Sequence, residues 1–215
     1  MTVDRADIAI AVGQDISAEV FEGLSYYVNS LLHWNTAINL VSKGDAKDIW
    51  RRHIIDSARI WPLAPVSAKT WLDLGSGGGL PGIVVAILAT GCERDLQLTL
   101  VESDQRKAVF LRKMITDLGL KANVCVSRAE VLERQAADVV SARALAPLQA
   151  LLPMAHRHMA AGAVCLFPKG QQYLAELDAV RQQWCFDLEI HHAPAVSDTP
   201  ILEIRHLTRF QEVGA

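Results

Sequence analysis

Short apolar segments alternate with helical segments over the carboxyl-terminal two thirds of this chain. Segments with the length and apolar content of strands occupy residues 70–74, 96–102, 122–126, 138–142, 163–167, 185–191 and 201–208. Helical patterns lie between them at 81–89, 104–117, 148–159 and 174–183. This alternation favours an α/β fold, a mostly parallel seven-stranded sheet with helices on both faces. The last two strands leave no room for a helix between them, so we predict an antiparallel edge.

The amino-terminal third has only helical periodicity. Apolar residues recur at helical spacing from Ser17, a suitable N-cap, to Trp34. A second helical pattern runs from about residue 46 to 61 and is ended by Pro62 and Pro65. We therefore predict a helical cap over residues 1–66 and a second domain over residues 67–215.

Composition excludes several classes of protein. With 51% hydrophobic and 21% charged residues the chain is neither disordered nor fibrous. The densest apolar run, residues 83–89, is far short of the roughly 18 residues that indicate a membrane span. No signal peptide is recognisable, and the cysteines lack metal or redox spacing. We expect a cytoplasmic monomer with reduced, buried thiols and no bound metal.

The charge balance limits how this chain can bind a polyanion. The formal net charge is −3, which argues against binding nucleic acid by bulk charge alone. Acids are concentrated in residues 1–30, so the remainder is close to neutral. Any site for a polyanion must therefore be a local patch.

A glycine-rich turn follows the first predicted strand. Residues 71–82 read WLDLGSGGGLPG, and Gly77 to Gly82 also fit G-x-G-x-x-G, the pattern of a dinucleotide site. Asp73 followed by Gly75, Gly77 and Gly79 favours S-adenosylmethionine instead, because an acid there can hold the cofactor's ammonium group, directly or through water. The same acid would repel a pyrophosphate. A turn without any ligand is the remaining alternative.

Polar residues also follow three later strands. Glu102 ends the second strand, where a carboxylate can accept both ribose hydroxyls of a nucleoside. Ala129 and Glu130 follow the third strand, either to present backbone and side chain to an adenine or as a solvated helix start. Arg143 follows the fourth strand, either among the reacting groups or as a loop cap.

The same region constrains the methyl acceptor. Enzymes that methylate exocyclic amines usually carry an Asn/Asp-Pro-Pro-Tyr/Phe loop after the fourth strand, where this chain reads Ser141-Ala-Arg-Ala144. Carbon-five of a pyrimidine needs a nucleophilic cysteine, yet Cys165 is in the middle of an apolar strand. A ring nitrogen such as guanine N7 needs neither, because its lone pair is already available.

The sequence resembles the bacterial 16S ribosomal RNA guanine-N7 methyltransferases, also called the glucose-inhibited division protein B family. The resemblance extends from about Ser17 to Phe210, and its most specific parts are Leu80-Pro81-Gly82 and Ala142-Arg143-Ala144. Further matches are Trp34-Asn35, Asn39-Leu40, Arg52-His53, Asp56-Ser57, the rest of the glycine turn, Ser127 to Glu130, and Lys169-Gly170.

The resemblance implies a Rossmann-like class I fold and methylation of one guanine of 16S ribosomal RNA in the small subunit. It implies S-adenosylmethionine contacts at Gly75, Leu80, Ala129, Glu130 and Arg143, beside Asp73, Gly77, Gly79 and Glu102. Candidate catalytic residues are Arg143, Lys169 and His53. Candidates for RNA phosphate contact are Lys43, Lys47, Arg51 and Arg52, with a second group, Arg106, Lys107, Arg112 and Lys113, on the helix at 104–117. Either group can instead be a solvated helix face, and for the second group that alternative is favoured.

Two other functions are compatible with the residues. One is a methyltransferase that acts on a small molecule or a protein, which the basic helix before the glycine turn disfavours. The other is a nucleotide-binding regulatory module without catalysis, for which Arg143 and Lys169 would be incidental.

Overall fold

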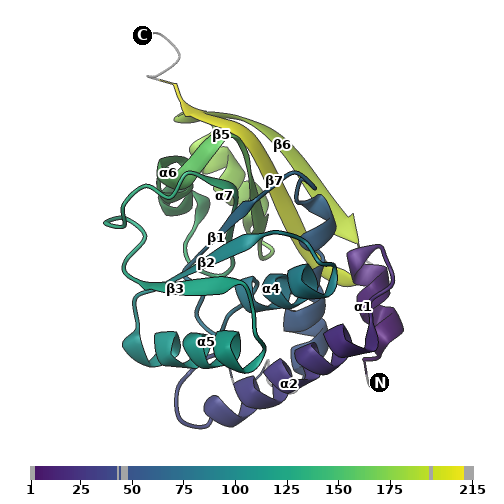
Figure 1. The fold of residues 1–215 in the computed structure, drawn as a ribbon. Helices are drawn as coiled ribbons and strands as arrows, with labels where there is room; N and C mark the ends of the chain where they lie inside the picture. The colour runs from purple at the N-terminus through teal and green to yellow at the C-terminus, as the bar shows by residue number, and fades with distance from the viewer. Residues whose placement is uncertain (1–2, 43, 45–47, 194–195, 211–215) are drawn as a thin grey trace.

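A seven-stranded sheet forms the centre of the molecule (Figure 1). The structure, a computed structural model, describes residues 3–42, 44, 48–193 and 196–210. The strands in chain order are β1 (Thr70–Leu74), β2 (Gln97–Glu102), β3 (Ala122–Val126), β4 (Ala137–Ala142), β5 (Met159–Pro168), β6 (Trp184–Ala193) and β7 (Ser197–Arg209). Their spatial order is β3-β2-β1-β4-β5-β7-β6.

The strand directions confirm the predicted sheet. Strands β3, β2, β1, β4 and β5 pair in parallel, while β7 is antiparallel to both β5 and β6. All seven predicted strands are present; β5 to β7 extend beyond their predicted ends. From β1 the chain adds β2 and β3 on one side and then β4 and β5 on the other, so the loops after β1 and β4 diverge at the carboxyl edge of the sheet. A crevice at this position is where open α/β sheets bind their ligands.

Helices cover both faces of the sheet (Figure 1). They are α1 (Arg5–Val12), α2 (Ala18–Trp34), α3 (Asp56–Ala58), α4 (Gly82–Gly91), α5 (Gln105–Asp117), α6 (Leu148–His158) and α7 (Tyr173–Val180). The predicted helix from Ser17 is confirmed, and the Ser17 hydroxyl accepts from the Val20 amide. The sequence analysis missed α1, whose first turn is held by a capping box between Asp4 and Asp7.

The segment before β1 differs from the regular helix expected there. Trp50–Ile55 forms a π-helix that continues into the short helix α3, and Trp61–Leu63 forms a 3₁₀ turn. Every residue from His53 to Trp61 is buried. A segment surrounded by other elements on all sides has no solvent-facing stripe, so helical periodicity alone predicts its geometry poorly.

Two hydrophobic clusters fill the two faces. One joins α1 to α5 to the side of the sheet that carries Trp71, Leu98 and Leu100, and the other joins α6 and α7 to the opposite side. The amino-terminal helices thus share a continuous core with α4 and α5, while the predicted division at residue 66 stays a prediction. Among the described helices, none has the length and apolar character to cross a membrane.

The contact between α2 and α4 depends on the absence of a side chain at Gly91. A Cβ atom at Gly91 would lie 1.9 Å from Cγ2 of Val20, which is buried. Gly23, on α2, faces Ile87 of α4 with more space, since its Cβ would lie 3.4 Å from Ile87 Cγ2.

We predict opposite effects for alanine at these two glycines. Gly91→Ala should lower the free energy of unfolding by about 1–3 kcal/mol, because valine is stiff and the core is already filled. Gly23→Ala should raise it by about 0.5–1 kcal/mol, because alanine favours a helix interior and fits the space. Urea denaturation measures both, and equal effects of the two changes would contradict this packing.

Candidate functional site

A cavity of about 560 Å³ opens at the carboxyl edge of the parallel strands. Its wall comes from the loops after β1, β2, β3 and β4, together with residues 40–42 and His53. Of the predicted cofactor residues, those in the wall are Gly75, Gly77, Leu80, Glu102, Ala129, Glu130 and Arg143. Residues from four separate loops that the sequence analysis assigned to one ligand therefore meet around one space.

The glycine turn is held close to its neighbours. Gly75 has φ of 65°, and a Cβ atom there would lie 2.5 Å from Cδ1 of Leu145. Gly78 is fixed from the other side, because the buried hydroxyl of Tyr27 donates to its carbonyl oxygen at 2.7 Å. Burial raises the pKa of Tyr27, which keeps this hydroxyl protonated and able to donate.

Asp73 lies beneath the turn and is absent from the cavity wall. Its side chain is fully buried, its Oδ1 accepts from Ser141 Oγ of β4 at 2.7 Å, and Ser76 Oγ donates to its backbone carbonyl. Asp73 therefore cannot contact the ammonium group of a cofactor in the cavity directly in this geometry. Of the two contacts that we predicted for Asp73, the one through a water molecule is left. Gly79 is also outside the wall, because it packs against Ile83 of α4.

Glu102 is at the cavity wall and is held in place by two backbone donors. The Gly77 amide donates to Oε2 and the Asp104 amide donates to Oε1, both at 2.8 Å, and the residue is only 7% exposed. Each carboxylate oxygen has further lone pairs that can accept a hydrogen bond. The side chain is thus an oriented acceptor suited to a pair of hydroxyl groups.

Arg143 lies between the strand-end loops and the amino-terminal segment. Its Nη2 donates to the Arg52 carbonyl at 2.6 Å and lies 3.8 Å from Oδ2 of Asp56. Asp56 is buried and also accepts from the hydroxyls of Ser197 and Thr199. The guanidinium is consequently tied to a segment far away in the sequence, with its side chain 16% exposed.

Lys169 lines a second cavity, of about 490 Å³, beside the first. It forms an ion pair with Glu176 and donates to the Ala146 carbonyl. Arg143 lines both cavities, whereas His53 lines the first one only. The three predicted catalytic residues are therefore distributed over two adjoining cavities.

Sequence reasoning missed two residues that shape the first cavity. Tyr27 is one, and a hydroxyl on the apolar stripe of α2 was the available signal. Asn35 was noted only as part of a matching motif. Its Oδ1 accepts from the amides of Leu40 and Val41, at 2.8 Å and 3.0 Å, which holds the loop that forms one wall.

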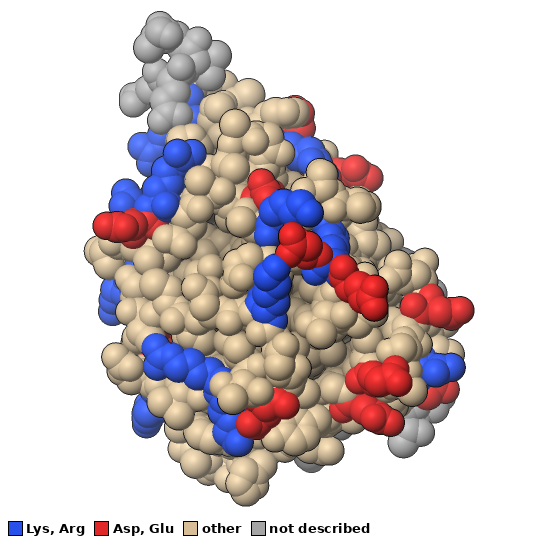
Figure 2. Space-filling view, in the orientation of Figure 1, with Lys and Arg blue, Asp and Glu red and all other residues tan. Residues whose placement is uncertain are grey.

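The predicted RNA-binding residues are only partly visible. Lys43 and Lys47 lie outside the described residues, Arg51 is half-buried, and Arg52 is exposed next to His53 of the cavity wall. In the second basic group, Lys107 lines the cavity. On the face drawn in Figure 2, basic side chains form small groups interspersed with acids.

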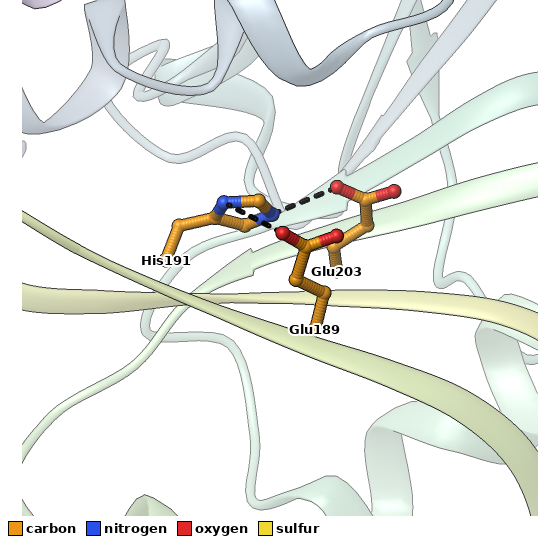
Figure 3. Close-up of side chains that lie close together, drawn as sticks. All are labelled: Glu189, His191 and Glu203. Carbon is orange, nitrogen blue, oxygen red and sulfur yellow. Dashed lines mark hydrogen bonds and ion pairs between the residues drawn. The ribbon is translucent and has the colours of Figure 1, made fainter.

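A separate cluster on β6 and β7 brings a histidine between two carboxylates (Figure 3). His191 Nε2 lies 2.8 Å from Glu203, and Nδ1 lies 3.8 Å from Glu189. The spacing of the histidines in the sequence did not predict this cluster. The ring nitrogen of His191 and the carboxylate oxygens of Glu189 and Glu203 are close enough together to hold a metal ion. Arg205 already pairs with Glu203 at 2.6 Å, and its charge opposes a cation. The expected absence of a metal stays a prediction.

Comparison with known proteins identifies the family. Residues 21–207 match the GidB family, described as rRNA small subunit methyltransferase G. This chain belongs to the GidB family. A relative from Cereibacter sphaeroides (strain ATCC 17025 / ATH 2.4.3), "Ribosomal RNA small subunit methyltransferase G", is 48% identical over 92% of this chain and 93% of its own. A relative of the same name from Ruegeria sp. (strain TM1040) is 42% identical over 91% and 95%.

Solved structures support the fold assignment. A methyltransferase from Geobacter sulfurreducens aligns with a TM-score of 0.55 at 13% identity, over 83% of this chain and 87% of its own. A putative S-adenosyl-L-methionine-dependent methyltransferase from Methanococcus maripaludis aligns with a TM-score of 0.55 at 14% identity, over 82% and 90%. The GidB chain thus has the Rossmann-like class I methyltransferase fold, as its sequence predicted.

The buried carboxyl of Asp73 should make stability depend on pH in an unusual direction. Burial raises the pKa of Asp73 to about 6, against the opposing effect of the Ser141 hydrogen bond. The native state then holds a proton that the unfolded state loses between about pH 4 and about pH 6, so stability falls as pH rises. As pH rises through that window, the unfolding free energy of Asp73→Asn should therefore increase by about 3 kcal/mol relative to that of wild type. Urea denaturation at a series of pH values measures it.

Asp138→Asn is the control for this measurement. Burial opposes ionisation of Asp138, but hydrogen bonds from the Lys69 and Thr70 amides prevail and lower its pKa. Its contribution to stability is present at higher pH and is lost as pH falls below about 4, the opposite sign. If the difference in unfolding free energy between wild type and Asp73→Asn is independent of pH, Asp73 has the same pKa in the folded and unfolded states.

Proposed function

We propose that this chain transfers a methyl group from S-adenosylmethionine to N7 of a guanine in 16S ribosomal RNA of the small subunit. The observation that carries the proposal is the meeting of Gly75, Glu102 and Arg143 around one cavity in a chain of the GidB family. The relatives are named as methyltransferases of small-subunit ribosomal RNA. The acceptor atom and the donor are our own inference. A ribosomal substrate would place the chain in the bacterial cytoplasm.

The cavity suits S-adenosylmethionine by its chemistry. Glu102 offers two oriented oxygens for the ribose hydroxyls, and the backbone of Gly75 to Gly78 lets a ligand approach closely. Ala129 and Glu130 are at the wall, where the adenine is expected. Structural neighbours support this assignment, because TYW2 from P. horikoshii was solved in complex with MeSAdo and the Methanococcus maripaludis neighbour is described as a putative S-adenosyl-L-methionine-dependent methyltransferase. When bound, the cofactor supplies a methyl group on a positively charged sulfur.

The residues of this chain supply alignment rather than acid–base chemistry. Guanine N7 carries an in-plane lone pair and loses no proton when a carbon–nitrogen bond forms there, so the base need only be held in line with the methyl group. The electron pair of the broken bond would stay on the departing sulfur, so no residue of this chain has to supply or accept a proton. Arg143, at the junction of the cavities, is placed to hold the acceptor against the cofactor site. His53, which also lines the first cavity, is a further group that would contact the ligands.

The available nucleophiles argue against the other acceptors. Among the described residues, neither cavity is lined by a cysteine. Cys165 is fully buried in β5, and burial raises the pKa of its thiol, so no thiolate is presented to a pyrimidine. The exposure of Cys185 and the partial exposure of Cys92 and Cys125 differ from the buried thiols that we expected. Their positions outside both cavities leave the chemical argument unchanged.

Glu102→Gln should weaken the binding of S-adenosylhomocysteine by about 10- to 150-fold, or about 1.5–3 kcal/mol, because hydrogen bonds to a charged acceptor are lost. Titration calorimetry measures the effect, with NADH as the competing ligand that should show no binding. Asp95→Asn, at an exposed acid away from the cavity, is the matched control. Unchanged affinity in Glu102→Gln would remove Glu102 from the site.

Arg143→Met should lose at least about 100-fold in methyl transfer to small ribosomal subunits, the scale on which misalignment reduces rate. The methylated base should be 7-methylguanine, which labelled methyl donor and borohydride–aniline strand scission detect. Near wild-type turnover of a folded Arg143→Met would reduce Arg143 to a loop cap. Label in another base would overturn the guanine-N7 assignment and leave the methyltransferase family standing.

A further inference from the structure

The second cavity lies directly beside the proposed cofactor site. Arg143, Ala144 and Leu145 line both cavities and form the boundary between them. A group that occupied the second cavity would therefore reach the first across this three-residue boundary. That is the position an acceptor must take relative to a methyl donor.

A partly buried ion pair is in the wall of this second cavity. Lys169 Nζ lies 2.6 Å from Glu176 Oε2, with the two side chains 10% and 22% exposed. Lys169 follows β5, while Glu176 is on α7, so two separate elements of the fold supply the pair. The side chains are sufficiently shielded for their hydrogen bonds to discriminate between ligands.

The hydrogen bonds of this pair leave one donor and one acceptor available. Glu176 Oε2 accepts from Lys169 and from the Leu148 amide at 2.8 Å, so both contacts use the same carboxylate oxygen. Lys169 donates to Glu176 and to the Ala146 carbonyl at 3.2 Å, two contacts for an ammonium with three N–H groups. Glu176 Oε1 and the third N–H of Lys169 are thus adjacent groups of opposite hydrogen-bonding character.

This arrangement distinguishes guanine from adenine when the orientation of the base in the cavity is fixed. Guanine places the acceptor O6 next to the donor N1–H, whereas adenine places an amino donor next to the acceptor N1. A donor beside an acceptor in the wall pairs with guanine in one orientation of the base and with adenine only in the reversed orientation, so the two bases would present N7 in different directions. Recognition of unstacked RNA bases through these edges is the usual basis of sequence selection in RNA.

We propose that Lys169 and Glu176 read the edge of the acceptor guanine, with Lys169 Nζ donating to O6 and Glu176 Oε1 accepting from N1–H. The atom on the other side of O6 is N7, which this pose would direct toward the Arg143–Leu145 boundary and the methyl donor. The inference rests on the proposed function and deepens it, because it assigns the residues that select the base.

The charge of the pair also suits the product. Methylation at N7 leaves a positive charge on the ring, which a lone ammonium at O6 would oppose. Glu176 neutralises Lys169 and accepts a hydrogen bond that strengthens as the ring becomes positive, a contact that favours the transition state. The same carboxylate disfavours an RNA phosphate as the occupant of this cavity.

Base analogues in the RNA test this inference on the wild-type protein. Small subunits are reconstituted with 16S RNA that carries guanine, inosine or 2-aminopurine at the mapped methylation position. Inosine keeps O6 and N1–H and should be methylated within about tenfold of guanine. The analogue 2-aminopurine keeps N7 but lacks both groups, and should be slower by about 100-fold or more, since a site with unpaired polar groups rejects its ligand. Equal rates on guanine and 2-aminopurine would overturn the proposal.

Variants separate base selection from a structural role of the pair. Glu176→Gln keeps an oxygen for the Leu148 amide but loses the charge, so it should reduce turnover on guanine and shrink the guanine-to-2-aminopurine ratio to about tenfold or less. Lys169→Met should do the same, and binding of S-adenosylhomocysteine should be unchanged in both. Asp95→Asn and Lys121→Met, which disrupt an exposed ion pair outside both cavities, should retain the wild-type ratio.

The outcomes distinguish this inference from the proposed function. Loss of turnover with an unaltered ratio in both variants would reduce Glu176 to a cap of α6 and overturn the inference. A wild-type protein that methylates guanine N7 without discriminating the analogues would do the same while the proposed function stands. A wild-type protein that leaves every guanine N7 unmethylated would refute the proposed function itself.

Discussion

The contact between Asp73 and Ser141 is the interaction on which the geometry of the site depends. Asp73 is the penultimate residue of β1, Ser141 is opposite it on β4, and their side chains are hydrogen-bonded at 2.7 Å. These neighbouring strands diverge into the two loops that carry Gly75 and Arg143. Burial of a carboxylate is costly, and a hydrogen bond from the adjacent strand reduces that cost. The register of β1 and β4 is therefore coupled to the placement of the cavity walls.

The amino-terminal helices complete the cavity that the sheet begins. Tyr27 of α2 bonds to Gly78, and Asn35 holds the loop that supplies Leu40 to the wall. A methyltransferase sheet alone would leave this side of the glycine turn open to solvent. The shared hydrophobic core makes these helices a rigid part of the site, because a packed core allows little relative movement.

Charged side chains connect the two proposed subsites through a small number of buried pairs. Asp56 lies near both Arg59 and Arg143 and accepts hydroxyls from the start of β7. Lys169 and Glu176 link the end of β5 to α7. Such pairs add little net stability, but removal of one partner leaves an uncompensated buried charge. Their value here is the fixed orientation of groups around a ligand.

The local pattern of the chain was sufficient to predict the strands, the main helices and the glycine turn. Strand and helix periods and turn chemistry are properties of consecutive residues, and parallel strands bring their carboxyl ends to one edge. The gathering of Gly75, Glu102, Ala129 and Arg143 could therefore be anticipated. Helix α1 and the π-helix at Trp50–Ile55 could not, since the apolar pattern of α1 is weak and the π-helix leads into a segment, residues 53–61, that is buried throughout.

Only the tertiary structure decided which side chains face the ligand space. Asp73 and Gly79 belong to the same motif as Gly75 and Gly77, yet packing against Ser141 and Ile83 places them outside the cavity wall. Glu176 is the opposite case, a residue that no sequence motif marks but that the fold places in a cavity wall. An acid on a helix face looks ordinary in the sequence, and only the fold brings Lys169 beside it. Sequence determines periodicity and the order of the elements, whereas contacts between residues distant in the chain determine the direction of each side chain.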